Sequence, residues 1–234
     1  MKMNFWSKSN ADTVPREVVL SSMPDRFRLP LLSLYAGEPQ RGKNGELFQH
    51  DPQSRIEAAQ GMWMYSLCRE IDPKETCEIG LGYGYSTIYI LAAIHANGCG
   101  AHLAIDPYQA AYHEIGMSQA KTIGMEDAFR LIPEKSSLAL TDLIRKERAF
   151  DFIYIDGGHR FDDALLDFVL AADLCKIGGY VVLDDMWMAS IQRVASFIRK
   201  NRVDFSEIQT PVGNISVFKK ISEDRRNWDS HVDF

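Results

Sequence analysis

The stretch EIGLGYGYST, residues 78–87, decides the fold of this 234-residue chain. It follows a short run that predicts a β-strand over residues 76–79, and it leads into a segment of helical composition over residues 86–96. Glycines at alternate positions let the backbone turn tightly and approach a ligand with no side chain in between. The free amides at the start of a helix favour negative charge, such as a carboxylate. The stretch therefore predicts a strand, a ligand-binding loop and a helix in succession.

The spacing of the glycines separates two kinds of ligand. The loop reads Gly80-x-Gly82-x-Gly84, whereas a dinucleotide-binding loop favours GxGxxG, which would place the third glycine at position 85. Glu78, two residues before the first glycine, would repel a diphosphate but suits a ligand that carries an amine. S-adenosylmethionine offers both an ammonium and a carboxylate group. A nicotinamide-dependent dehydrogenase is disfavoured on these grounds, and a glycine turn without any ligand stays open.

From residue 55 onward, predicted strands and helices alternate along the chain, which indicates a doubly wound, Rossmann-like α/β fold. Such alternation predicts a mostly parallel sheet with helices on both faces, and the last two strands, joined by a hairpin-like connection, predict an antiparallel edge. We expect helices over 55–70, 86–96, 112–124, 136–147, 162–174 and 190–200, and strands over 76–79, 101–105, 129–132, 150–155, 180–183, 205–209 and 215–219.

Residues 1–54 have a different composition from the rest of the chain. Five prolines and three glycines interrupt them, so the segment is expected to hold no long helix. We interpret it as an extension packed on the main domain, with a role as a lid or substrate-side cap. The main domain then covers residues 55–220, and residues 221–234 form a C-terminal tail.

Composition excludes several classes of protein. Hydrophobic residues make up 46% and charged residues 25% of the chain, which is typical of a globular domain. No apolar run is long enough to span a membrane, and residues 1–10 lack the apolar core of a signal peptide, so we expect a cytoplasmic protein. The net charge of −6 and the absence of a dense basic run argue against a nucleic-acid partner. The four cysteines lack zinc-site spacing and are expected to be buried, reduced thiols.

Acidic residues follow several of the predicted strands. In a parallel sheet the ligand binds beyond the carboxyl ends of the strands. Asp106 ends the second strand, 28 residues after Glu78, where a carboxylate can accept both hydroxyls of a ribose. Asp106 precedes a proline, so a simple turn residue is the alternative interpretation.

Three further aspartates, Asp156, Asp184 and Asp185, follow two strands predicted to be neighbours. Adjacent strands lie about 4.8 Å apart, so these carboxylates are expected to converge. Their mutual repulsion favours a hard divalent cation, and oxygen ligands suit Mg²⁺. Solvated loop carboxylates, or an Asp156 that contacts only the cofactor, are the alternatives.

His159 lies three residues beyond Asp156, on the loop at the active edge of the predicted sheet. Imidazole titrates near neutral pH, so this side chain is a candidate general base that takes a proton from a hydroxyl group. The alternative is a loop histidine that binds substrate or caps a helix.

Through these residues, the region from residue 55 to residue 220 resembles the class I S-adenosylmethionine-dependent methyltransferases. Within that superfamily it is most similar to metal-dependent O-methyltransferases of the catechol type, and to macrolide and antibiotic-sugar O-methyltransferases with a strand-Asp-Gly-x-His segment. The resemblance implies a seven-stranded sheet with an antiparallel last strand. It also implies that residues 78–87, including Tyr85 and Ser86, hold the methionine part of the cofactor.

The resemblance carries over to further positions, residue by residue. Asp106 matches the ribose-binding acid, and Ser136 matches a position near the adenine. Asp156, Asp184 and Asp185 match the metal ligands, whereas His159 stands where the catechol enzymes carry a lysine base. That departure puts a catechol substrate and the identity of the base in doubt.

These expectations combine into one hypothesis, a Mg²⁺-dependent enzyme that methylates a hydroxyl group of a small molecule. A metal-independent O- or N-methyltransferase and a non-catalytic cofactor-binding protein of the same fold are the alternatives. A homodimer is one open possibility for its assembly, and no membrane partner is expected. Four apolar or aromatic residues flank the predicted site. They are expected to form either a pocket for the acceptor or part of the hydrophobic core: Tyr108, Tyr112, Trp187 and Met188.

Overall fold

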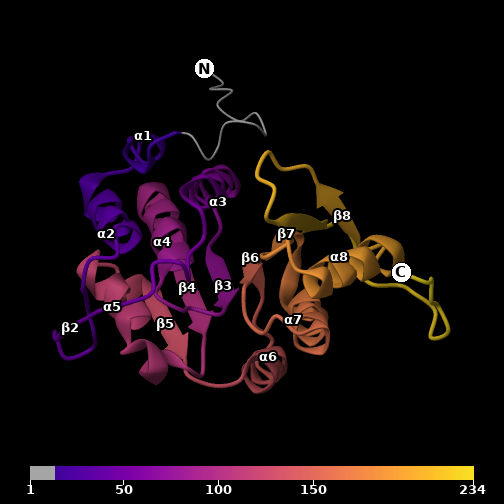
Figure 1. Cartoon of the computed structure of the whole chain (residues 1–234). Helices are drawn as coiled ribbons and strands as arrows, with labels where there is room; N and C mark the ends of the chain where they lie inside the picture. The colour runs from indigo at the N-terminus through magenta and orange to yellow at the C-terminus, as the bar shows by residue number, and fades with distance from the viewer. Residues whose placement is uncertain (1–13) are drawn as a thin grey trace.

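The computed structural model describes residues 14–234 and confirms the α/β architecture (Figure 1). Seven strands form one sheet in the order β5-β4-β3-β6-β7-β9-β8. All of them are parallel except β9, which is antiparallel to both of its neighbours. The strands are β3 (Glu75–Ile79), β4 (Ala101–Ile105), β5 (Phe129–Ile132), β6 (Phe150–Ile155), β7 (Cys175–Leu183), β8 (Phe205–Ile208) and β9 (Ser216–Lys220).

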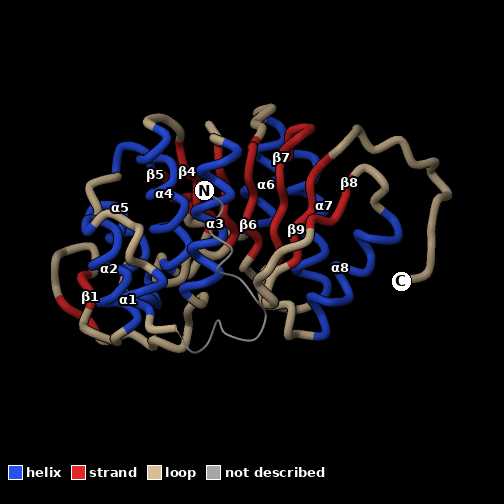
Figure 2. Tube along the Cα trace, turned by 90° about the horizontal axis from the view of Figure 1, so that it is seen from above, coloured by secondary structure: helices blue, strands red, loops and turns tan. Residues whose placement is uncertain are grey.

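Helices cover both faces of this sheet (Figure 2). Successive side chains of a strand point to opposite faces, so Phe152 and Tyr154 of β6 pack with the helices of one layer and Ile153 and Ile155 with those of the other. One layer holds α3 (Ala58–Ile71), α4 (Tyr85–Asn97) and α5 (Ile115–Thr122), and the other holds α6 (Ser136–Arg145), α7 (Phe161–Leu174) and α8 (Ala189–Asn201).

The N-terminal extension corrects one expectation from the sequence. It contains α1 (Arg16–Val19), a two-stranded sheet of β1 (Gln40–Arg41) and β2 (Leu47–Phe48), and the eleven-residue helix α2 (Asp25–Tyr35). The expectation that this segment holds no long helix is therefore wrong. Pro24 caps α2 and Pro30 lies inside it, and the helix persists because one of its faces is buried. Residues 1–13, and with them the expected lack of a signal peptide, lie outside the described part.

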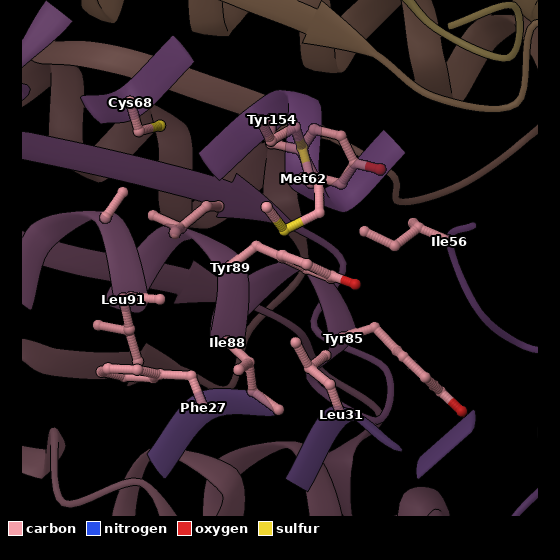
Figure 3. Packing of buried hydrophobic residues seen from close by; sticks show 14 of the residues in the cluster. Phe27, Leu31, Ile56, Met62, Cys68, Tyr85, Ile88, Tyr89, Leu91 and Tyr154 are labelled. Atoms are coloured by element: carbon pink, nitrogen blue, oxygen red, sulfur yellow. The ribbon is translucent and has the colours of Figure 1, made fainter. Parts of the chain in front are cut away.

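Helix α2 belongs to the main hydrophobic core. Phe27, Leu31 and Leu34 follow one another at helical spacing and are fully buried. Phe27 and Leu31 face Ile88 and Leu91 of α4 (Figure 3). Helix α4 is thus covered by the sheet on one side and by other helices on the rest, which explains why it is apolar all round.

Smaller differences from the predicted elements have local causes. The strand expected over 180–183 begins earlier, because β7 includes Gly178 and Gly179, where a bulge shifts the register against β6. The tail runs beside α8, where Asn201 exchanges two hydrogen bonds of 2.8 Å with the backbone of Val232. The cysteines are free thiols as expected, but Cys99 is exposed whereas the other three are buried.

The order of the strands in the sheet indicates where a ligand would bind. The chain runs from β3 outward to β4 and β5, and it then returns to the other side of β3 to form β6 and β7. The direction of winding reverses between β3 and β6, and ligands of doubly wound sheets bind beyond the strand ends at such a point. No helix within residues 14–234 is long and apolar enough to cross a membrane.

Candidate active site

A cavity of about 730 Å³ opens at the carboxyl ends of β3, β4, β6 and β7. The loops after these four strands line it, together with the N-terminus of α6 and the first turns of α7. Residues 53–57, which lead into α3, form a further part of its wall. The structure brings together in this one cavity the predicted site residues Gly80, Gly82, Tyr85, Ser86, Asp106, Ser136, Asp156, His159, Asp184 and Asp185.

The glycine loop has the backbone that its sequence predicts. Gly80, Gly82 and Gly84 all have positive φ angles, of 92°, 51° and 84°. A Cβ at Gly80 would lie 2.0 Å from the carbonyl oxygen of Asp156, so no other residue fits between β3 and β6 there. Gly84 precedes the first residue of α4 and packs against Gly116 of α5. The loop is therefore shaped by close backbone packing as well as by its cavity-facing side.

Glu78 lies beneath this loop and not in the cavity wall. Its side chain is completely buried, and the hydroxyls of Ser86 and Thr87 donate to its two carboxylate oxygens. Nε2 of the buried His102 lies 3.0 Å from the same carboxylate. Glu78 thus fixes the start of α4 from behind. Its contact with a methionine amine stays a prediction, and the geometry shows a supporting role instead.

Asp106 is held by neutral donors. The backbone N–H groups of Leu81 and Gly82 donate to its Oδ2 at 3.1 and 3.0 Å, and Nε2 of Gln109 does so at 2.9 Å. The N–H of Tyr108 donates to Oδ1 at 2.7 Å. Asp106 therefore joins the end of β4 to the glycine loop while it lines the cavity, which goes beyond the role of a simple turn residue.

Asp156, His159 and Asp185 form a compact cluster across the cavity. Nε2 of His159 lies 2.7 Å from Oδ2 of Asp185 and 3.4 Å from Oδ1 of Asp156. One ligand atom from each of the three side chains lies within 4.8 Å of the others, a spacing that suits a bound metal ion. Asp185 has a φ of 55°, a left-handed conformation that aspartate tolerates better than most residues.

Asp184 lies behind this cluster. Its side chain is almost completely buried and accepts hydrogen bonds from the Tyr154 hydroxyl, from Nδ2 of Asn214 at 3.0 Å and from the N–H of Asp185. Gln60 of α3 donates in turn to the Tyr154 hydroxyl at 3.1 Å. The predicted ligand set is therefore divided, because His159 has joined Asp156 and Asp185 where Asp184 was expected. Direct ligation by Asp184 stays a prediction.

The ionisation of the cluster reflects its crowding. Hydrogen bonds to Asp156 and Asp185 raise the pKa of His159 to about 10, so its imidazole carries a proton that partly balances the carboxylates. Burial raises the pKa of Asp156 above its usual range, and burial together with the charge of Asp156 raises the pKa of Asp184 further. The pKa of Asp185 is lowered, chiefly by the His159 hydrogen bond.

These donors fit a divalent cation. Carboxylate oxygens are common ligands of Mg²⁺ and Mn²⁺. Burial and, to a smaller extent, repulsion between the aspartates raise the pKa values of Asp156 and Asp184, and a bound cation would oppose both effects. Asp156 and Asp185 are the carboxylates placed to hold it, with His159 beside them and with Asp184 and Asn214 orienting Asp185 from behind.

Ser136, Ser137 and Asp167 also line the cavity. Tyr108 and Trp187 stand at its mouth, with 63% and 69% of their side chains exposed. They are therefore not core. Tyr112 also lines the cavity, whereas Met188 packs against the core of the α6–α8 layer.

Sequence reasoning missed three groups in the cavity wall. Asp167 lies one helical turn after Asp163, and this i, i+4 spacing on α7 was the available signal. Asn214 comes from the β8–β9 hairpin, whose return to the site follows only from the sheet order. Arg55 and Glu57 lie at the assumed domain boundary, where no motif marked them.

Comparisons with known proteins agree with this geometry. A family model described as a methyltransferase domain matches residues 77–186, from β3 to the loop after β7. The matched region is just under half of the chain, and over it the chain is similar to class I S-adenosylmethionine-dependent methyltransferases. The seven-stranded sheet with its antiparallel β9 has the arrangement that the resemblance of the sequence to this superfamily implied.

Individual members of the superfamily are similar to the chain over most of its length. A flavonoid 3',5'-methyltransferase of Vitis vinifera is 27% identical over 158 residues, which cover 64% of this chain and 65% of that protein. A caffeoyl-CoA O-methyltransferase of Stellaria longipes is 24% identical over 166 residues, with coverage of 66% and 65%. The match thus spans slightly less than two thirds of these relatives. The fold is similar to that of an O-methyltransferase from Bacillus cereus in complex with SAH, with a TM-score of 0.65, 20% identity and coverage of 88% and 94%.

Proposed function

We propose that this protein transfers a methyl group from S-adenosylmethionine to a hydroxyl group of a small molecule, with the help of a divalent cation. The observation that carries the proposal is the convergence of two half-sites on one cavity. A glycine loop with Asp106 forms the first, and the cluster of Asp156, His159 and Asp185 forms the second. A protein that only bound the cofactor would need no second half-site.

The first half-site suits the cofactor. Gly80 and Gly82 give the methionine part close access to the backbone of the loop, and the start of α4, with Tyr85 and Ser86, lies beside it. Asp106 and Ser136 line the same cavity, and in the proposed arrangement Asp106 binds the ribose and Ser136 lies near the adenine. When bound, S-adenosylmethionine supplies a methyl group on a positively charged sulfur.

The second half-site suits activation of a hydroxyl group. Asp156 and Asp185 would hold a divalent cation there, and such a cation would lower the pKa of a nearby hydroxyl group. His159 is placed at the same cluster to take the proton that the hydroxyl loses on methylation. For that role its imidazole must be neutral, so its ion pairs with Asp156 and Asp185 have to be released when the site is occupied.

The relatives and the mouth of the cavity support the type of acceptor. The names of the similar proteins from Vitis vinifera and Stellaria longipes refer to flavonoid and caffeoyl-CoA methylation. The exposed ring of Trp187 lies next to Asp185, to which its indole N–H donates, and the exposed ring of Tyr108 also lines the cavity. A small acceptor with a planar, apolar part therefore fits this entrance. A homodimer and a cytoplasmic location stay predictions.

A methyl-transfer assay tests the proposal. The full chain is incubated with labelled S-adenosylmethionine and with matched pairs of planar acceptors that carry either a hydroxyl or an amine, before and after treatment with a chelator. We expect label on the hydroxyl compounds only, lost with the chelator and restored by Mg²⁺ or Mn²⁺. Transfer that survives the chelator would favour a metal-independent enzyme, and label on the amines would favour N-methylation.

A further inference from the structure

Gln109 is a buried amide that no motif of the sequence indicated. It is the first residue of a short 3-10 helix (Gln109–Tyr112) that follows β4, and only 4% of it is exposed. Its side chain lies behind the wall of the cavity and not in it. Buried polar groups are expected to find their hydrogen-bond partners within the protein. The partners of Gln109 therefore show what this side chain holds in place.

The side-chain amide of Gln109 joins three parts of the first half-site. Nε2 donates one hydrogen bond of 2.9 Å to Oδ2 of Asp106 and another of 2.9 Å to the carbonyl oxygen of Gly82. Oε1 accepts a hydrogen bond of 3.3 Å from the N–H of Met117, in the first turn of α5. One amide thus connects the end of β4, the glycine loop and the start of α5.

The two oxygens of Asp106 differ in how many donors they already have. Oδ2 accepts hydrogen bonds from the N–H groups of Leu81 and Gly82 as well as from Gln109. Within residues 14–234, Oδ1 accepts one hydrogen bond, from the N–H of Tyr108. Each oxygen of a carboxylate has about two acceptor sites. Oδ2 is therefore fully occupied, whereas Oδ1 can accept a further hydrogen bond from a ligand.

Close packing fixes the orientation of the Gln109 amide. A Cβ on Gly116 would lie 2.4 Å from the carbonyl oxygen of Gly82 and 3.0 Å from Oε1 of Gln109, so the start of α5 packs directly on both groups. An amide with its oxygen and nitrogen exchanged would place an oxygen against the Asp106 carboxylate and the Gly82 carbonyl, where it could not bond to either. Only the observed orientation satisfies all three partners.

We propose that Gln109 is a positioning residue for the cofactor. By binding Oδ2 of Asp106 and the carbonyl of Gly82, it leaves Oδ1 as the atom that accepts from the cofactor and fixes the shape of the glycine loop. This assignment rests on the proposed function, because it assumes that the cavity binds S-adenosylmethionine. The hydrogen bonds of the Gln109 side chain all lie in the first half-site, so the chemical step should not depend on it.

Two substitutions of similar shape test the assignment. Gln109→Met keeps most of the side-chain volume and removes all three hydrogen bonds, whereas Gln109→Glu keeps the shape and places a carboxylate against Asp106. The full chain is titrated with S-adenosylhomocysteine in a calorimeter at pH 8. We expect Gln109→Met to weaken binding by about tenfold and Gln109→Glu by at least about a hundredfold. Hydrogen bonds to charged groups are among the stronger ones in proteins, and like charges at close range repel.

Steady-state kinetics separates positioning from a general loss of structure. With a hydroxyl compound that the methyl-transfer assay identifies, we expect each variant to raise the KM for S-adenosylmethionine by about the factor by which its binding weakens. The kcat at saturating cofactor should stay within about threefold of wild type, because the lost interaction acts on binding and not on the chemical step.

Gln119→Glu is the matched control. Gln119 is also a buried amide, on α5, but its Nε2 donates to Gln40 at 3.2 Å and not to Asp106. We expect this variant to lower the temperature of thermal unfolding and to bind S-adenosylhomocysteine within about threefold of wild type. A loss of binding as large as that of Gln109→Glu would assign the effect to any buried charge in this region and contradict the positioning role.

The outcomes separate this assignment from the proposed function. If the wild type does not bind S-adenosylhomocysteine, the proposed function fails, and the assignment fails with it. If the wild type binds and a folded Gln109→Met also binds within about threefold, the function stands and Gln109 only fills space. Gln109→Met decides this even if Gln109→Glu does not fold, because it adds no buried charge.

Discussion

The carboxylates of the two half-sites differ in the groups that surround them. At the cofactor side, Asp106 accepts hydrogen bonds from three backbone N–H groups and one side-chain amide, all of them neutral. At the acidic side, Asp156 and Asp185 share one imidazole, and Asp184 is buried behind them. Protein donors therefore satisfy the Asp106 carboxylate. The second half-site holds more negative charge than the nearby protein groups compensate, which is the electrostatic condition for binding a cation.

The same contrast appears in how each half-site is built. The glycine loop depends on backbone shape, since Gly80 fits only because it has no side chain. The acidic cluster depends on side chains from two neighbouring strand ends. Changes at the first half-site should therefore affect cofactor binding and the fold together, whereas changes at the second should affect the metal and turnover and leave cofactor binding largely intact.

The largest effect is expected at His159. Replacement by alanine removes the group placed to accept the proton, and general-base catalysis contributes typically 10²- to 10⁴-fold. We expect turnover of an accepted hydroxyl compound to fall within that range, while S-adenosylhomocysteine binds within about threefold of wild type. Full turnover across the pH range would show that His159 is not the base.

Gly80→Ala tests the close backbone packing of the glycine loop in the first half-site. A Cβ there would overlap the carbonyl of Asp156, whereas a Cβ on Gly82 would meet nothing within 4 Å. Both positions have positive φ angles, so Gly82→Ala controls for backbone strain. We expect Gly80→Ala to weaken S-adenosylhomocysteine binding by about a hundredfold or to prevent folding, and Gly82→Ala to retain the fold. Calorimetry and thermal unfolding of both variants decide this, and equal effects would contradict the close-packing argument.

A pair of single substitutions separates the half-sites directly. Asp185→Ala removes a proposed metal ligand, and Asp106→Ala removes the acceptor that holds the glycine loop. We expect Asp185→Ala to weaken Mn²⁺ binding by at least about tenfold with little change for S-adenosylhomocysteine, and Asp106→Ala to show the reverse. Titration of each variant with each ligand provides the four values. Parallel losses in both variants would mean that the half-sites are not independent.

The smallest effect concerns stability at Asp167. Because burial raises its pKa in the folded protein to about 6, above the ordinary 3.8, its ionisation opposes folding at pH 8. This penalty decreases as the pH falls below about 6 and is nearly gone at pH 4. Asp167→Asn should therefore raise the free energy of unfolding by about 1–3 kcal/mol at pH 8 and change it little at pH 4. Denaturant unfolding at both pH values measures this, and a constant difference would contradict the shift.

Much of the fold was predictable because its signals are local. Alternating apolar strands and helices indicated the sheet, and the glycine spacing with Glu78 indicated the loop. Helix α2 was not predicted, because two prolines in its sequence outweighed the spacing of Phe27 and Leu31. Its stability comes from packing on α4, which no local pattern records.

The site was predictable to a similar extent. Positions after strands identified Asp106, Asp156 and His159, since topology alone brings strand ends together. The hydrogen-bond partners of the site residues could not be predicted from the sequence. The sequence does not show that Glu78 points away from the cavity, or that Asn214 returns from a distant hairpin to contact Asp184.

The most direct test of the central claim is a two-step calorimetric titration of chelator-treated protein, first with S-adenosylhomocysteine and then with Mg²⁺. The account predicts saturable binding of S-adenosylhomocysteine without metal, followed by a separate Mg²⁺ heat that disappears in Asp185→Ala. Absence of S-adenosylhomocysteine binding with and without Mg²⁺ would contradict it.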